Sequence, residues 1–163
     1  MKKVATLVFV VVLALCFIGC SSLNKVENVI REENYVSINM EDETSQTGIK
    51  KAVANAVLND YDKIDALSLD NGKAKLYVWA VLPSNVMGLA SLSYAIVVEF
   101  SSKNALVKEL LENAEFKAIV ESAVGEEITQ ELAYDKGFAV DNCLTYAKGP
   151  LASKLYETLS TVA

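Results

Sequence analysis

Residues 92–100 alternate between two kinds of side chain, and this pattern constrains the fold more than any other feature of the sequence. One face of the segment carries only large apolar side chains: Leu92, Tyr94, Ile96, Val98 and Phe100. The other face is mostly small or polar, with Ser91, Ser93, Ala95 and Glu99 beside Val97. A period of two residues is that of a β-strand with one face toward the core and one wetter face. The pattern predicts a long strand over residues 87–102 of an antiparallel sheet.

A second strand signal surrounds the dipeptide Asn71-Gly72. Apolar segments lie on both sides of it, at residues 63–70 and 73–83. Asn-Gly readily supplies the positive φ angles that a two-residue type I′ turn requires. The sequence therefore predicts a β-hairpin that ends at Pro83. Its core-facing side chains are expected to be Leu67, Leu69, Ala74, Leu76 and Val78.

The remaining segments complete an α+β prediction. A short strand is expected at residues 35–40, and apolar residues at helical spacing predict helices over 49–60 and 104–124. The C-terminal third favours helix at 126–134 and after Gly149-Pro150, whereas residues 137–149 are ambiguous between helix and strand. The expected order is β-α-β-β-β-α-α. This order corresponds to an antiparallel sheet of about four strands with helices packed mainly on one face.

The N-terminus has the features of an export signal. Lys2 and Lys3 precede an uncharged apolar run over residues 4–18, and Gly19 and Cys20 stand where a cleavage site belongs. The run is near the lower length limit for crossing a bilayer, which is about 17 residues. The favoured interpretation is a cleaved signal peptide, and the alternative is a retained anchor helix.

The tetrapeptide Phe17-Ile18-Gly19-Cys20, followed by two serines, resembles a bacterial lipobox, although Leu is more usual than Phe at its first position. The resemblance implies cleavage after Gly19. It also implies that Cys20 receives a diacylglyceryl thioether and usually an N-acyl chain such as palmitate. Two or more acyl chains anchor a protein stably to a membrane.

The lipobox divides the chain into three expected parts. Residues 1–19 are the signal peptide, residues 20–34 a lipidated tether or short helix, and residues 35–163 a single domain. The apolar stripe of the second part, at Leu23, Val26 and Ile30, is expected to pack on that domain. The protein is expected to be lipid-anchored in the cell membrane or the outer membrane, with its domain outside the cytoplasm.

Composition argues against several classes of function. The chain has 15 basic and 21 acidic residues, net −6, and without Lys2 and Lys3 the net charge is −8. An acidic domain repels phosphate backbones, so nucleic acid is not an expected partner. The chain has no histidine, which removes Ser-His-Asp and Cys-His nucleophile systems and the commonest zinc ligand. We expect neither an enzyme nor a bound cofactor.

The remaining cysteine and the clustered acids are expected to be structural. Cys143 is the one thiol left after export and lipidation, so it is expected to be a buried core residue. The acids at positions 60, 62, 65 and 70 do not have the spacing of a calcium-binding loop and are expected to form a solvated rim. No metal site is predicted.

Tyr77 and Trp79 are the candidate binding residues. They share one face of a strand whose other face is already apolar. Either helices cover both faces of the sheet and these aromatic side chains pack in a second layer, or they line a surface for a partner or ligand. The sequence leaves both alternatives open.

Residues 48–84 are similar to the first half of a BON domain. The corresponding features are the helix, Gly72 at the turn, Leu76, and Pro83-Ser84. Val78 stands where that family has a glycine, and its next helix is replaced by the strand over 87–102. The resemblance implies a helix followed by a hairpin, in a family that associates with phospholipid in the bacterial envelope.

Two functional hypotheses follow for the mature domain. The first is a non-catalytic lipoprotein that docks a protein or another envelope component through an exposed apolar patch around Trp79. The alternative is a carrier of a lipid or another hydrophobic ligand, which requires an unfilled cavity between sheet and helix.

Overall fold

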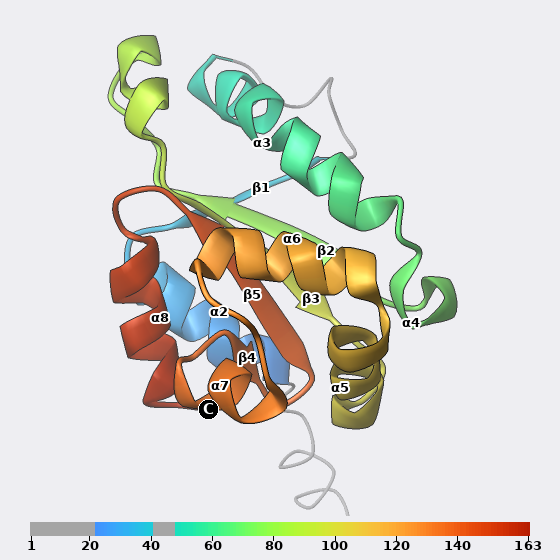
Figure 1. The fold of residues 1–163 in the computed structure, drawn as a ribbon. Coiled ribbons are helices and arrows are strands. Elements are labelled where there is room, and N and C mark those ends of the chain that lie inside the picture. Colours follow the sequence, from blue (N-terminus) through green and yellow to red (C-terminus); the bar gives the residue numbers. More distant parts are fainter. Residues whose placement is uncertain (1–21, 41–47) are drawn as a thin grey trace, which may run out of the picture.

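The fold is built on one antiparallel sheet. The computed structural model describes residues 22–40 and 48–163, so Gly19 and Cys20 lie outside the described residues. Five strands pair in the order β1-β2-β3-β5-β4 (Figure 1). They are β1 (Val36–Ile38), β2 (Lys75–Ala80), β3 (Tyr94–Glu99), β4 (Ala139–Val140) and β5 (Cys143–Lys148). The α+β class with an antiparallel sheet is confirmed, with five strands where about four were expected.

Helices cover both faces of this sheet. The longer ones are α2 (Ser22–Glu32), α3 (Ile49–Asp65), α5 (Lys103–Glu112), α6 (Ala114–Val124) and α8 (Ala152–Ser160), with shorter turns at α4 (Leu69–Gly72), η1 (Val86–Ser91) and α7 (Gln130–Asp135). Helices α3 and α6 lie in front of the sheet and α2 behind it (Figure 1). The expectation of helices mainly on one face is therefore wrong.

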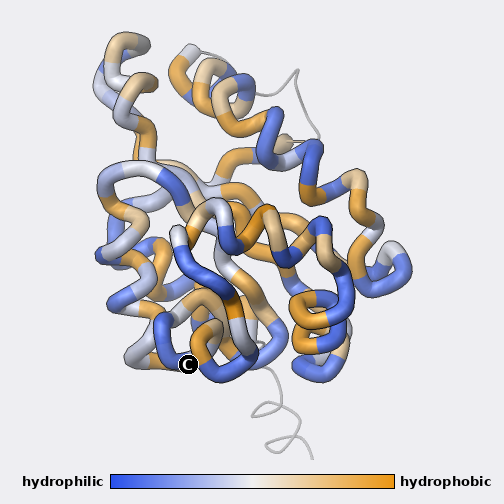
Figure 2. Tube along the Cα trace, in the orientation of Figure 1, coloured by the Kyte–Doolittle hydropathy of each residue, from blue (hydrophilic) through white to orange (hydrophobic). Residues whose placement is uncertain are grey.

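Burial of both sheet faces explains this arrangement. In register, Val78, Ile96 and Tyr146 share one face, and Trp79, Ala95 and Ala147 share the other. All six side chains are buried. Apolar residues predominate in the middle of the longer strands, whereas the helices carry both kinds of residue (Figure 2). The wetter face expected for β3 is absent, because packed helices take the place of water on both sides.

Residues 63–72 are not the first strand of a hairpin. Helix α3 continues to Asp65, and β2 pairs with β1 and β3 instead. The positive φ angles expected at Asn71 and Gly72 are present, at 56° and 76°, but they belong to the short turn α4, which lies between α3 and β2. This turn is held by contacts distant in sequence, because the Asp70 N–H donates to Glu109 Oε1 at 2.8 Å and Asp70 Oδ2 accepts from the Ser101 N–H at 2.8 Å.

Three further segments differ from the sequence-based expectation. The strand expected over 87–102 is shorter, because η1 occupies its first part. The helix expected over 104–124 breaks at Asn113, whose side chain accepts from the Phe116 N–H at 3.0 Å and so caps α6. The ambiguous segment 137–149 contains the hairpin of β4 and β5, which turns at Asp141 and Asn142.

Residues 22–32 form a helix of the packed fold. Val26, Val29 and Ile30 of α2 are buried, so of the two interpretations of this stretch the structure shows the helix. Lys25 Nζ lies 2.9 Å from Asp141 Oδ2, which places the start of α2 beside the β4–β5 turn. Every described helix and strand falls within residues 22–163. Among these elements, none is both long and apolar enough to cross a bilayer.

Cys143 is fully buried at the start of β5, as expected for a core residue. Burial, with carboxylates nearby, raises the pKa of its thiol to about 12. The thiolate is the reactive form of cysteine, so this side chain is chemically quiet at neutral pH.

Candidate functional site

Of the two aromatic residues expected at a binding surface, Trp79 is buried and Tyr77 is partly exposed. Trp79 is only 2% exposed, and the Arg31 guanidinium of α2 lies 4.8 Å from the centre of its ring. Tyr77 is half-buried on the same sheet face and donates to Glu99 Oε2 at 3.1 Å. For Trp79 the structure shows the packed layer, whereas Tyr77 also lines a pocket of about 360 Å³ between β1, β2 and Tyr61 of α3.

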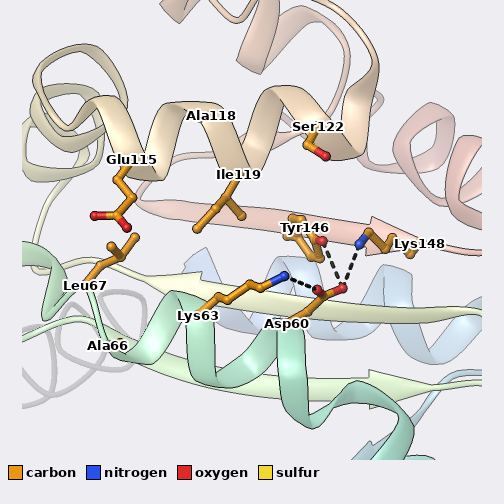
Figure 3. Close-up of a pocket in the computed structure, with 10 residues that line it drawn as sticks. All are labelled: Asp60, Lys63, Ala66, Leu67, Glu115, Ala118, Ile119, Ser122, Tyr146 and Lys148. Atoms are coloured by element: carbon orange, nitrogen blue, oxygen red, sulfur yellow. Dashed lines mark hydrogen bonds and ion pairs between the residues drawn. The ribbon is translucent and has the colours of Figure 1, made fainter.

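A groove that combines charged and apolar side chains lies on the opposite sheet face, and we call it the α3–α6 groove. It has a volume of about 590 Å³ and lies between helices α3 and α6 above β5 (Figure 3). This volume is within the range of about 300–1,000 Å³ typical of small-molecule sites. Its lining residues are Asp60, Lys63, Ala66, Leu67, Glu115, Ala118, Ile119, Ser122, Tyr146 and Lys148.

Asp60 organises the polar end of the groove. Its Oδ2 atom accepts hydrogen bonds from the Tyr146 hydroxyl at 3.0 Å, from Lys148 Nζ at 2.8 Å and from the Tyr94 hydroxyl. Lys63 Nζ lies 4.0 Å from Oδ1, an ion pair rather than a hydrogen bond. One carboxylate on α3 thereby connects to two strands of the sheet.

Hydrogen bonding keeps this carboxylate ionised. Burial alone would raise the pKa of Asp60, but the three hydrogen bonds that it accepts outweigh burial and hold the pKa below its usual range. The same hydrogen bonds also shift the pKa values of the groups that donate them. Burial and the bond to Asp60 raise the pKa of the Tyr94 phenol, and the bond to Asp60 raises the pKa of Lys148 against the effect of burial.

The groove has two chemically distinct ends. Leu67 and Glu115 lie at one end, and Lys148 and Ser122 at the other (Figure 3). Ile119 projects between them from α6. The alanines Ala66 and Ala118 contribute little side-chain volume to its lining, which leaves space between the two helices.

Sequence reasoning placed Asp60 in a solvated acidic rim, and this was wrong. The Asp60 side chain is only 12% exposed. The sequence did contain a sign of this burial. Asp60 lies seven residues after Val53, three after Val57 and four before Ile64, which is the spacing of one helix face. It therefore occupies the buried stripe of α3, where an acid needs partners. Asp70 is also buried, at 8% exposure, whereas Asp62 and Asp65 are exposed as expected.

Known proteins give no guide to this site. No family model, curated protein or solved structure matches the chain. For the BON-like stretch, the expected helix is present as α3, but the expected hairpin is not. Within residues 22–40 and 48–163, no group of three or more His, Cys, Asp or Glu side chains is arranged to hold a metal ion.

Asp60→Asn tests the polar end of the groove. We expect it to lower the free energy of unfolding at pH 7 by about 1.5–3 kcal/mol, because charge-assisted hydrogen bonds are lost. Since the folded pKa is lowered, the contribution of Asp60 is complete above its ordinary pKa of about 4 and is lost as pH falls through the folded value. Urea unfolding at pH 7 and at a series of pH values below about 4 should show the wild type and variant converging as the pH falls. The exposed Asp62→Asn is the control, and an equal effect from it would contradict this role for Asp60.

Proposed function

We propose that this chain is a lipid-anchored, non-catalytic protein of the bacterial cell envelope that binds a small, partly apolar ligand in the α3–α6 groove. The lipobox-like tetrapeptide ending at Cys20 supports the anchor and the location. The observation that carries the binding function is the groove itself, an open space of about 590 Å³ between sheet and helices. This is the feature that a hydrophobic-ligand carrier requires.

The groove favours a carrier over docking at the aromatic pair. Docking around Trp79 requires an exposed ring, and α2 covers that ring. The groove instead combines apolar walls from Leu67 and Ile119 with a small set of charged groups. Apolar walls with a few placed polar groups are typical of small-molecule sites.

Docking of an envelope protein is a second candidate function, at a different surface. Residues 76–98 contain no charged side chain, and η1 lies in this stretch. Met87 within η1 is 89% exposed and Leu82 before it 36%. Exposed methionines are frequent at surfaces that accept protein partners.

Native mass spectrometry of residues 21–163, exported to a bacterial periplasm without the lipid, tests the binding proposal. We expect an added mass of a few hundred daltons, the size of a drug-like ligand. Ala118→Trp should abolish the adduct, because the indole fills the groove. Ala56→Trp is the matched control, an exposed alanine on α3 that does not line the groove. An unliganded wild type, or equal adducts in both variants, would reject the groove as the site.

A further inference from the structure

The charge at the polar end of the α3–α6 groove is opposite to the charge of the protein. Two ammonium groups, Lys63 and Lys148, stand against one carboxylate, Asp60, which leaves one net positive charge. The chain as a whole has a net charge of −6. A local positive site in an acidic domain favours an anionic group on the ligand.

Both lysines retain hydrogen-bonding capacity for such a group. An ammonium carries three donors, and Lys148 uses one on Asp60 at 2.8 Å. Lys63 lies 4.0 Å from the carboxylate, and its side chain is 58% exposed. An acid placed between the two lysines would gain charge-assisted hydrogen bonds without displacing Asp60 from its tyrosines.

The other end of the groove suits an apolar chain. Ala66 and Leu67 at the end of α3 face Ile119 of α6 across the groove (Figure 3). Glu115 also lies at this end and would repel a second acid there. One end of the groove is therefore cationic and the other largely apolar, which matches the anionic head and apolar chain of an acidic amphiphile.

The fold determines which end of the groove lies nearer to the start of α2. Helix α2 begins beside Asp141, at the start of β5, whereas Lys148 ends β5. The strand has six residues, and five rises of about 3.4 Å separate its ends by roughly 17 Å. Leu67 lies at the opposite end of the groove from Lys148, toward the start of β5 (Figure 3). The apolar end therefore points to the pole where α2 begins, and the charged end points away from it.

We propose that the α3–α6 groove binds a single-chain acidic amphiphile, with its acid between Lys63 and Lys148 and its chain on Leu67 and Ile119. The inference rests on the proposed ligand-binding function. With Cys20 lipidated two residues before α2, the apolar end faces the membrane and the acid end lies farthest from it. A fatty acid or a lysophospholipid with an anionic headgroup has this chemistry.

Isothermal titration of residues 21–163 with laurate and with dodecyltrimethylammonium, both below micelle formation, tests the proposal. The two probes have the same chain length and opposite charge. We expect laurate to bind at least about tenfold more tightly, and Lys63→Gln to weaken laurate by about tenfold. Lys51→Gln, on the exposed side of the same helix, should leave laurate binding unchanged. Lauroyl-lysophosphatidylglycerol, if it binds more tightly than laurate, identifies a phospholipid as the ligand, and the reverse order identifies a free fatty acid.

The outcomes separate this inference from the proposed function. Equal binding of both probes, or laurate binding unaffected by Lys63→Gln, would reject the acid site and leave the groove as a ligand site. If neither probe binds while native mass spectrometry still shows an adduct that Ala118→Trp removes, the amphiphile is rejected and ligand binding stands. If neither probe binds and no adduct is found, both are rejected.

Discussion

Replacing Trp79 with alanine is expected to lower the free energy of unfolding by about 3–5 kcal/mol, as for other large aromatic side chains in protein cores. The indole is 2% exposed and lies between the sheet and α2. Its removal would leave a cavity that the strands and helix can close only in part. Urea unfolding followed by far-ultraviolet circular dichroism measures the change without using the lost tryptophan signal.

A companion variant separates packing from polarity at this position. Among the described residues, the Trp79 indole N–H has no hydrogen-bond partner. Trp79→Phe should therefore cost less than Trp79→Ala, because it removes an unpaired donor and retains an aromatic ring. Met87→Ala, at an 89% exposed position, should change stability by less than about 0.5 kcal/mol. Stability unchanged by Trp79→Ala would show that the ring is not buried and restore it as a docking residue.

Cys20→Ser is expected to abolish lipid attachment and to leave a longer, uncleaved precursor. The lipobox resemblance assigns the thiol of Cys20 as the acceptor of the diacylglyceryl group, and a serine hydroxyl is not that acceptor. Incorporation of labelled palmitate and mobility on a denaturing gel measure the two effects. We expect label only in the wild type and a larger apparent mass only in the variant.

Cys16→Ser provides the matched control. Bulky Leu15 precedes Cys16, so this cysteine does not fit the lipobox and its variant should be processed as the wild type is. A Cys20→Ser protein that is cleaved and membrane-bound like the wild type would overturn the proposed anchor. The proposal of ligand binding in the groove does not depend on this anchor and would remain to be tested separately.

The strand cores and the class of fold were predictable because they depend on local periodicity. The alternation around Ile96 identified β3, and the apolar segment around Val78 identified β2. The hairpin at Asn71-Gly72 was wrong for a nonlocal reason. Asn71 and Gly72 do adopt positive φ angles. The turn does not join two paired strands, however, because Asp70 is fixed by Glu109 and Ser101, which are more than 30 residues away in sequence. Which partner a strand takes is decided by such contacts, and a local pattern does not contain them.

The candidate site was less predictable than the fold. The groove is lined by residues from α3, α6 and β5, so it exists only after three distant segments assemble. The one local clue was an aspartate in the apolar stripe of α3, at position 60. Trp79 was a candidate binding residue that is in fact buried. An aromatic residue on a strand gives the same sequence pattern whether a helix or solvent covers it.

The position of β5 has a consequence for the order of events during the proposed export. This strand, residues Cys143–Lys148, lies in the interior of the sheet between β3 and β4. Under the proposed export, a chain that enters the channel from its N-terminus has β3 with one unpaired edge until β5, which lies within the last 21 residues, has crossed. Contacts between segments so far apart form slowly, and open strand edges invite aggregation. Under the proposed export, the sheet can therefore be completed only when translocation is nearly finished, and a chain truncated after β4 should fail to fold.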